Sequence, residues 1–124
     1  MSGLTNEELF AIPFRREAVA VQGANGEEAT ILVRELSEAE SEALGAVLYP
    51  VDEASGKVGF NANLHDARWV VACAINEDGS RRFADDELER VASLPRGIVS
   101  RLADAARKIN RADGDQPAAD AAKN

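Results

Sequence analysis

The chain is poor in cysteine, in aromatic residues and in positive charge. Its 124 residues include one cysteine, Cys73, so no disulfide can form within the chain. Aromatic residues make up 5% of the sequence, so the core must be built mostly from aliphatic side chains and alanine. The formal net charge is −8, whereas binding to nucleic acid or to anionic lipid requires a basic surface. We therefore expect no direct contact with nucleic acid or membrane, and a partner that is basic or amphipathic.

The sequence also lacks long hydrophobic runs. No stretch reaches the roughly 20 apolar residues of a transmembrane helix. The N-terminal residues, MSGLTNEELF, have neither the basic nor the apolar region of a signal peptide. We therefore expect a protein that is made and used in a cytosol. A chain of this length forms one domain and needs no metal or disulfide to fold.

A change of pattern near Ser37 predicts an α+β fold. Before it, β-branched residues recur in segments 17–21 and 29–36, on either side of a segment rich in glycine and asparagine. This arrangement favours a β-hairpin that spans about Glu17 to Leu36. Because two strands alone are only marginally stable in water, the hairpin must pack on helices or on a partner.

Four helices are predicted after the hairpin. Ser37 stands three positions before an acidic residue, as in a capping box, and opens a helix that stops before Pro50. Asn63 and Asp85 are the expected N-caps of the next two helices. Pro95 stands at the first position of the last helix, where its missing N–H costs little.

The helix after Asn63 is apolar on nearly all sides, which is typical of a helix at the centre of a core. Its segment Trp69-Val70-Val71 also fits a short strand, since brief apolar runs do not distinguish the two. We expect Trp69 here, and Leu102 in the last helix, to be core residues.

Three stretches lie outside the hairpin and these helices. Thr5 has capping-box spacing and opens a short helix or turn that ends near Pro13. Segment 51–61 contains two glycines and no clear period, so it is predicted to be a mobile loop. Residues 113–124 are small and polar and are predicted to be disordered. The expected organisation is therefore one domain, residues 1–112, followed by this tail.

No set of residues predicts catalysis, a cofactor or a metal site. His65 is the only histidine and lacks the partners that a metal or an acid–base role requires. Cys73 lies in an apolar segment without the electropositive setting of a reactive thiol. The acidic run 85–89 lacks the spacing of a calcium loop and suits a helix N-terminus. We therefore expect a protein without enzymatic activity, with no catalytic, cofactor-binding or metal-binding residue.

Phe10, Ile12 and Phe14 are apolar residues that alternate near the N-terminus, beside the hairpin. One interpretation is that they pack on the core. The other is that they form a strand-like contact with a partner chain, a common mode of protein recognition.

The order of these elements resembles the tail assembly chaperones of long-tailed phages and prophages, in the version with an N-terminal β-hairpin. The stretch that carries the resemblance is residues 66–110, DARWVVACAINEDGSRRFADDELERVASLPRGIVSRLADAARKIN. Segments 4–9 and 33–37 and the closing pair Lys123-Asn124 are similar to the family as well. Two positions depart from the family pattern. Ala84 stands where the family often has a Ser or Thr helix cap, so Asp85 is expected to act as the cap instead. Arg111 stands where the family commonly has a glycine.

The resemblance implies the fold already predicted and a late protein of the host cytoplasm. Such a chaperone binds the tape measure protein, a very long and largely helical chain, before tail-tube subunits polymerise around it, and is absent from the mature virion. Phe10, Ile12 and Phe14 are then the expected contacts with this partner. A small structural tail or connector component of the virion is an alternative, and an acidic inhibitor or DNA mimic is a second one.

The resemblance also implies ribosomal frameshifting near the end of the reading frame, which yields a longer product. Ala122-Lys123-Asn124 can be encoded as GCA-AAA-AAC, which contains the slippery heptanucleotide A-AAA-AAC. This chain would then be the short product, and the longer product would recruit the tail tube protein. A simple polar ending is the alternative, and the codons at these positions decide between the two.

Overall fold

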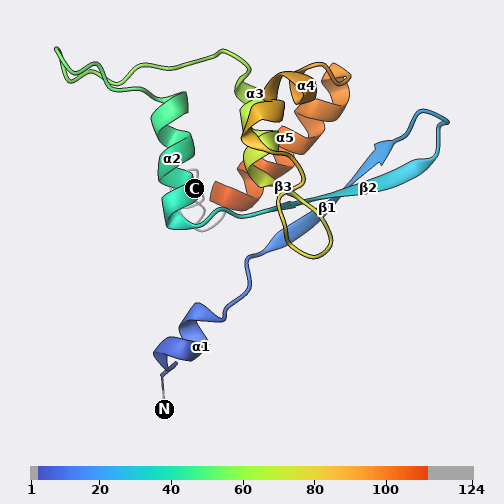
Figure 1. Ribbon diagram of the computed structural model, residues 1–124, viewed down its shortest axis with the longest axis horizontal. Coiled ribbons are helices and arrows are strands. Elements are labelled where there is room, and N and C mark those ends of the chain that lie inside the picture. Colours follow the sequence, from blue (N-terminus) through green and yellow to red (C-terminus); the bar gives the residue numbers. More distant parts are fainter. Residues whose placement is uncertain (1–2, 112–124) are drawn as a thin grey trace, which may run out of the picture.

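A three-stranded antiparallel sheet and a set of helices make up residues 3–111, the part of the chain that the computed structural model describes (Figure 1). The α+β fold predicted from the sequence is confirmed, whereas the predicted tail, residues 113–124, lies outside the described residues. The elements in chain order are α1 (Asn6–Phe10), β1 (Arg16–Gln22), β2 (Glu28–Arg34), α2 (Glu38–Leu48), α3 (His65–Cys73), β3 (Ala74–Ile75), the 3-10 turn η1 (Asp85–Glu87), α4 (Leu88–Ala92) and α5 (Arg96–Arg111).

The predicted hairpin is formed by β1 and β2. Its register pairs Arg16 with Arg34 at the open end and Gln22 with Glu28 at the turn. Gly26 has φ +78° in this turn, a conformation that glycine adopts at little cost. Because side chains alternate along a strand, Val19, Val21 and Val33 lie on one face of the hairpin and are buried against the helices. The other face carries Ala18, Ala20 and the partly buried Leu32.

The sheet has a third strand that the sequence analysis did not predict. Strand β3 pairs with β2, with Leu32 opposite Ile75 and Val33 opposite Ala74. The strand interpretation of Trp69-Val70-Val71 is wrong, since α3 stays helical to Cys73 and the chain turns extended at Ala74. The run of apolar residues continues from the helix into the strand, because the end of α3 and the whole of β3 are buried.

Two predicted helix caps are also wrong. Asn63 does not cap α3; Leu64 takes that position with φ +51°, a left-handed conformation that is uncommon for leucine. Asp85 does not cap the helix that follows it, because Ala84 stands at the cap and its backbone N–H donates to the Glu87 side chain at 2.9 Å. The capping boxes predicted before α1 and α2 are both present.

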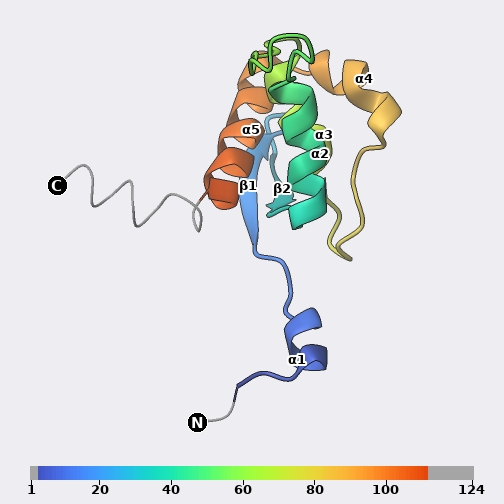
Figure 2. The same cartoon turned by 90° about the vertical axis from the view of Figure 1, so that its left-hand side faces the viewer.

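The core lies between the helices and one face of the sheet (Figure 2). Leu102 is 2% exposed, as predicted, but Trp69 is only half-buried and packs against the edge of the core. None of the helices within residues 3–111 is long and apolar enough to cross a membrane. The buried cluster consists of Val19, Val21, Val33, Ala67, Val70, Val71, Cys73, Ala74, Val91, Val99, Leu102, Ala103 and Ala106.

Candidate partner-binding surfaces

The N-terminal arm, defined here as residues 4–14, stands clear of the rest of the molecule (Figures 1 and 2). Phe10 is 83% exposed, and Ile12 and Phe14 are about half exposed. Leu4 and Leu9 are exposed as well, so a short segment carries five exposed large apolar side chains. The interpretation that Phe10, Ile12 and Phe14 pack on the core is therefore wrong, and these residues form an exposed apolar surface.

The arm joins the body at a firmly held point. The backbone N–H of Arg15 donates to the Glu35 carboxylate at 2.7 Å, and its guanidinium donates to that carboxylate at 3.2 Å and to the Ile109 carbonyl at 3.0 Å. Pro13 restricts Ile12 to extended backbone. The arm is therefore directed away from the body by local geometry as well as by this anchor.

Arg34 connects the arm to the start of α2. Its side chain is 10% exposed. One Nη donates to the Glu40 carboxylate at 2.8 Å, and the other donates to the Glu35 carbonyl at 2.8 Å. Its Cζ lies 4.6 Å from the centre of the Phe14 ring, within the range of a cation–π interaction. The charge of this arginine is therefore both paired and shielded from water.

The Arg34–Glu40 pair gives the protein an acid-sensitive contact. The hydrogen bond from Arg34, helped by the Ser37 backbone N–H, lowers the pKa of Glu40 from 4.5 to about 2, against the opposing effect of burial. A lowered pKa in the folded state adds stability above pH 4.5, and this stability is lost as the pH falls through about 2. Because the Glu40 side chain is 39% exposed, solvent screening reduces the contribution to about 1 kcal/mol.

We expect Glu40→Gln to remove this part of the acid sensitivity. Urea unfolding between about pH 5 and about pH 2 should show a shallower loss of stability in the variant than in the wild type. Glu38→Gln is the matched control, because Glu38 is an exposed carboxylate on the same helix. If the free energy of unfolding depends on pH equally in wild type and Glu40→Gln, the Arg34–Glu40 pair does not contribute to the acid sensitivity.

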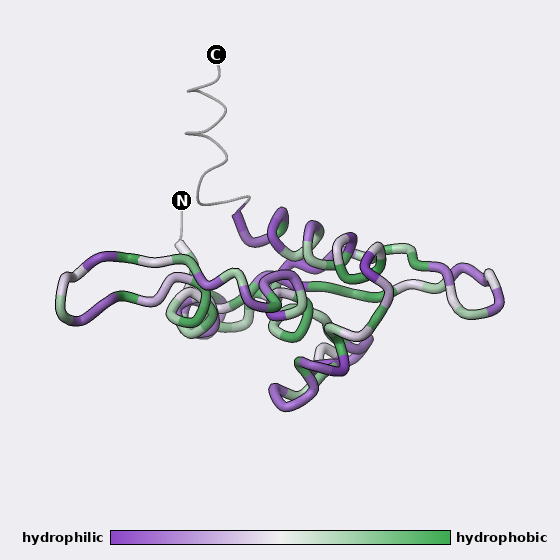
Figure 3. The backbone as a smooth tube through the Cα atoms, turned by 90° about the horizontal axis from the view of Figure 1, so that it is seen from above, coloured by the Kyte–Doolittle hydropathy of each residue, from purple (hydrophilic) through white to green (hydrophobic). Residues whose placement is uncertain are grey.

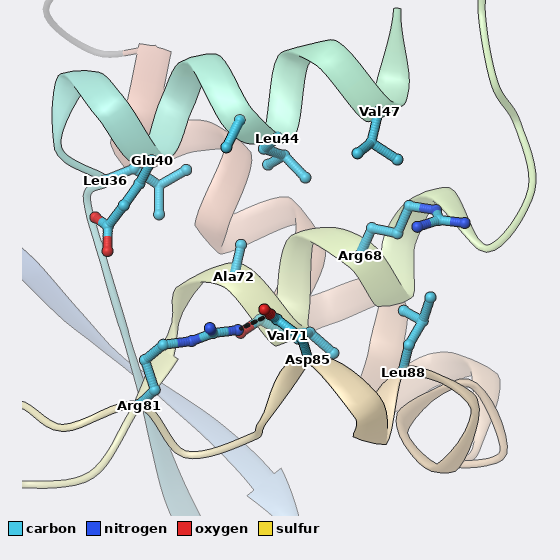
Figure 4. A pocket seen from close by; sticks show the side chains of 11 residues that line it. Leu36, Glu40, Leu44, Val47, Arg68, Val71, Ala72, Arg81, Asp85 and Leu88 are labelled. Carbon is cyan, nitrogen blue, oxygen red and sulfur yellow. Dashed lines mark hydrogen bonds and ion pairs between the residues drawn. The ribbon is translucent and has the colours of Figure 1, made fainter. Parts of the chain in front are cut away.

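An apolar groove of about 340 Å³ lies between α2 and α3 (Figure 4). Helix α2 contributes only one fully buried residue, Leu48, so its groove-facing side chains stay accessible. Arg68 lies at the mouth of the groove between Val47 and Leu88 (Figure 4). The groove is lined by Leu36, Glu40, Ala43, Leu44, Val47, Arg68, Val71, Ala72, Arg81, Asp85 and Leu88.

The two arginines of the groove differ in their pairing. Arg81 donates to the Val71 carbonyl at 2.9 Å and to the Asp85 carboxylate at 2.8 Å. Arg68 donates through Nε to the Asn63 carbonyl at 3.0 Å and forms no ion pair with any acid among residues 3–111. The groove therefore combines an apolar floor with a cation that lacks a carboxylate partner in the described chain.

Residues 49–60 form a second projecting segment, which contains most of the loop predicted at 51–61. A bridge between Val51 and Val58 closes it into a narrow hairpin-like shape, at the opposite end of the molecule from the β1–β2 turn (Figure 3). The Tyr49 and Phe60 rings lie 5.7 Å apart, and both are about half exposed. The exposed apolar residues of segment 49–60 could have indicated this surface from the sequence. The glycines within the segment interrupt the apolar spacing, so no period was recognised.

The residues considered for chemistry lie apart from one another. Cys73 is fully buried, and burial raises the pKa of its thiol to about 12. His65 lies against the Phe60 ring, with 5.2 Å between ring centres. Asp85 pairs with Arg81. Among residues 3–111, no group of histidine, cysteine and acidic side chains is placed to hold a metal ion.

Comparison with known proteins identifies the fold. No protein-family model matches the chain, and no curated protein matches its sequence. Among solved structures, the tail assembly chaperone of bacteriophage HK97 matches with a TM-score of 0.52 and 22% identity, over 77% of this chain and 85% of that chain. The resemblance seen in the sequence is therefore confirmed in three dimensions, and the chain has the fold of a phage tail assembly chaperone.

Proposed function

We propose that the protein is a phage tail assembly chaperone that binds the tape measure protein and leaves before the virion is complete. The observation that carries this proposal is the fold shared with the HK97 chaperone over most of both chains. The order of sequence elements from residue 66 to residue 110 supports it independently, because it resembles the same family.

The surface of the molecule suits this task. A long amphipathic chain exposes apolar surface that aggregates unless it is covered. The N-terminal arm offers apolar side chains that the described part of the chain leaves uncovered, and the net charge of −8 keeps a complex with such a chain in solution. We assign Phe10, Ile12 and Phe14 as the contacts with the tape measure protein.

Co-expression with the tape measure protein of the same phage tests this function. We expect the tape measure protein to move from the insoluble to the soluble fraction and to copurify with the chaperone. Mass spectrometry of purified virions should then detect the tape measure protein and not this chain. Finding the chain in stoichiometric amounts in virions would instead identify a structural tail or connector component.

We further propose that this chain is the shorter of two products, and that a −1 frameshift near Lys123 adds a domain that recruits the tail tube protein. The support is the ending Ala122-Lys123-Asn124, which a slippery heptanucleotide can encode. Other codons at these positions, with no open −1 frame after them, would contradict this part of the proposal.

A further inference from the structure

Segment 49–60 carries an apolar face that stays exposed in the described chain. We propose that this face is a second contact site for the tape measure protein, and that it binds an amphipathic helix whose apolar residues are flanked by basic ones. The identity of this partner rests on the proposed function, but the contact surface is separate from the N-terminal arm.

The register of segment 49–60 places its large side chains on one face. The bridge pairs Val51 with Val58, and the same antiparallel register sets Tyr49 opposite Phe60, whose ring lies 5.7 Å from that of Tyr49. Because side chains alternate along a strand, residues two positions apart point the same way. These four side chains therefore form one apolar face, and each is between 48% and 66% exposed.

Hydrogen bonds at both ends of the segment hold this face in shape. At the tip, the Asp52 carboxylate accepts from the Ala54 backbone N–H at 3.2 Å and from the Ser55 hydroxyl at 2.8 Å. At the base, the Asn61 backbone N–H donates to the Leu48 carbonyl at 2.8 Å. A surface that is ordered before binding loses little conformational entropy when a partner covers it.

The distribution of aromatic residues supports a role in binding. The chain has four phenylalanines, one tyrosine and one tryptophan. Three of the phenylalanines and the tyrosine are exposed, and they lie on the N-terminal arm (Phe10, Phe14) or on segment 49–60 (Tyr49, Phe60). Since aromatic side chains are enriched in the cores of protein interfaces, segment 49–60 has the same character as the surface already assigned to the client.

Helix α2 sets the spacing between these two surfaces. The arm ends at Arg15, whose backbone is bonded to Glu35 shortly before α2, and segment 49–60 begins directly after Leu48, the last residue of the helix. The 11 residues of α2 separate the two attachment points by about 16 Å along the helix axis. A client helix of about three turns spans this distance, so one helix can contact both surfaces, and each contact raises the effective concentration of the other.

Charge complementarity defines the flanks of the client helix. Glu38 and Glu42 are exposed on α2, and Glu53 is exposed at the tip of segment 49–60. None of these carboxylates forms an ion pair with a base among residues 3–111. Unpaired acids beside apolar surfaces favour a partner that places lysine or arginine next to its apolar residues. The same acids oppose insertion of the segment into an anionic membrane.

Photo-crosslinking during co-expression with the tape measure protein tests the contact directly. The photoreactive amino acid p-benzoylphenylalanine is incorporated at Val58, on the apolar face. Incorporation at Ala24, in the exposed β1–β2 turn at the opposite end of the molecule, is the matched control (Figure 3). We expect position 58 to crosslink to the tape measure protein several-fold more than position 24.

Substitutions give a second, independent measurement. Val51→Asp should lower the amount of copurified tape measure protein about fivefold or more, because an apolar helix cannot cover a carboxylate without a desolvation cost. Ala54→Asp adds the same charge at the tip, outside the apolar face, and should retain the wild-type amount. Glu53→Lys should lower the amount several-fold, whereas Glu27→Lys in the β1–β2 turn should leave it unchanged.

The possible outcomes distinguish this contact site from the proposed function. If position 58 crosslinks only to a second copy of the chain, or no more than position 24 does, the site is wrong while copurification of the client upholds the function. Wild-type amounts of client on Val51→Asp and Glu53→Lys chains with the wild-type melting curve would also overturn the site. If the wild-type chain itself fails to keep the tape measure protein soluble, the function and the site are both contradicted.

Discussion

Leu102→Ala is expected to lower the free energy of unfolding by about 3 kcal/mol, within the usual range for a buried leucine in a packed core. Leu102 is 2% exposed and lies on the face of α5 that packs against the sheet and α3. The loss combines the transfer free energy of the removed methyl groups with the cost of the cavity they leave. Since small domains are stable by only about 5–15 kcal/mol, this is a large share of the total.

Urea and thermal unfolding measure this effect. We expect the melting temperature to fall by about 10 °C or more. Lys108→Ala on the same helix is the matched control, because Lys108 is exposed and its loss should change the stability by less than about 0.5 kcal/mol. A loss below about 1 kcal/mol in Leu102→Ala would mean that the helix packs on the sheet less tightly than the structure shows.

The double variant Phe10→Asp/Phe14→Asp is expected to lose the tape measure protein from the soluble fraction, with the copurified amount falling about tenfold or more. A carboxylate at either position cannot be buried in an apolar contact without a large desolvation cost. The fold should survive, because Phe10 is 83% exposed and Phe14 is 47% exposed.

The leucine variant Phe10→Leu/Phe14→Leu is the matched control, since it keeps the apolar character of both positions and should retain most of the binding. A melting curve for the aspartate variant close to that of the wild type establishes that any loss arises from the surface. If a folded aspartate variant still keeps the tape measure protein soluble, the client is held by another surface, and the function itself is unaffected. Failure of the wild-type chain in the same assay would contradict the proposed function.

Local patterns were sufficient for much of the fold. The hairpin and its turn, the helix that Ser37 opens, and the burial of Leu102 all follow from the spacing of apolar residues and from turn and cap chemistry. The capping box before Asn6 is likewise a feature of four consecutive residues. The sequence also singled out Phe10, Ile12 and Phe14 as alternating apolar residues near the N-terminus, beside the predicted hairpin. It left open whether they face the core or a partner.

Contacts between distant segments required the tertiary structure. Strand β3 exists only because Ala74 and Ile75 meet Leu32 and Val33, about 40 residues earlier in the chain, and two residues are too few to give a period. Leu64 replaces Asn63 at the start of α3, an outcome that intrinsic capping preference does not predict.

The candidate surfaces likewise depend partly on local sequence patterns and partly on contacts between distant segments. The sequence by itself determined a small acidic protein with an α+β fold, an apolar N-terminal segment and no recognisable catalytic motif, because composition, periodicity and motif spacing are local properties. Only the tertiary structure decided that Arg34 lies buried between Phe14 and Glu40, and that α2 and α3 leave a groove with Arg68 at its mouth. The groove is the space left between two helices joined by residues 49–64, so its shape depends on packing angles that neither helix encodes alone.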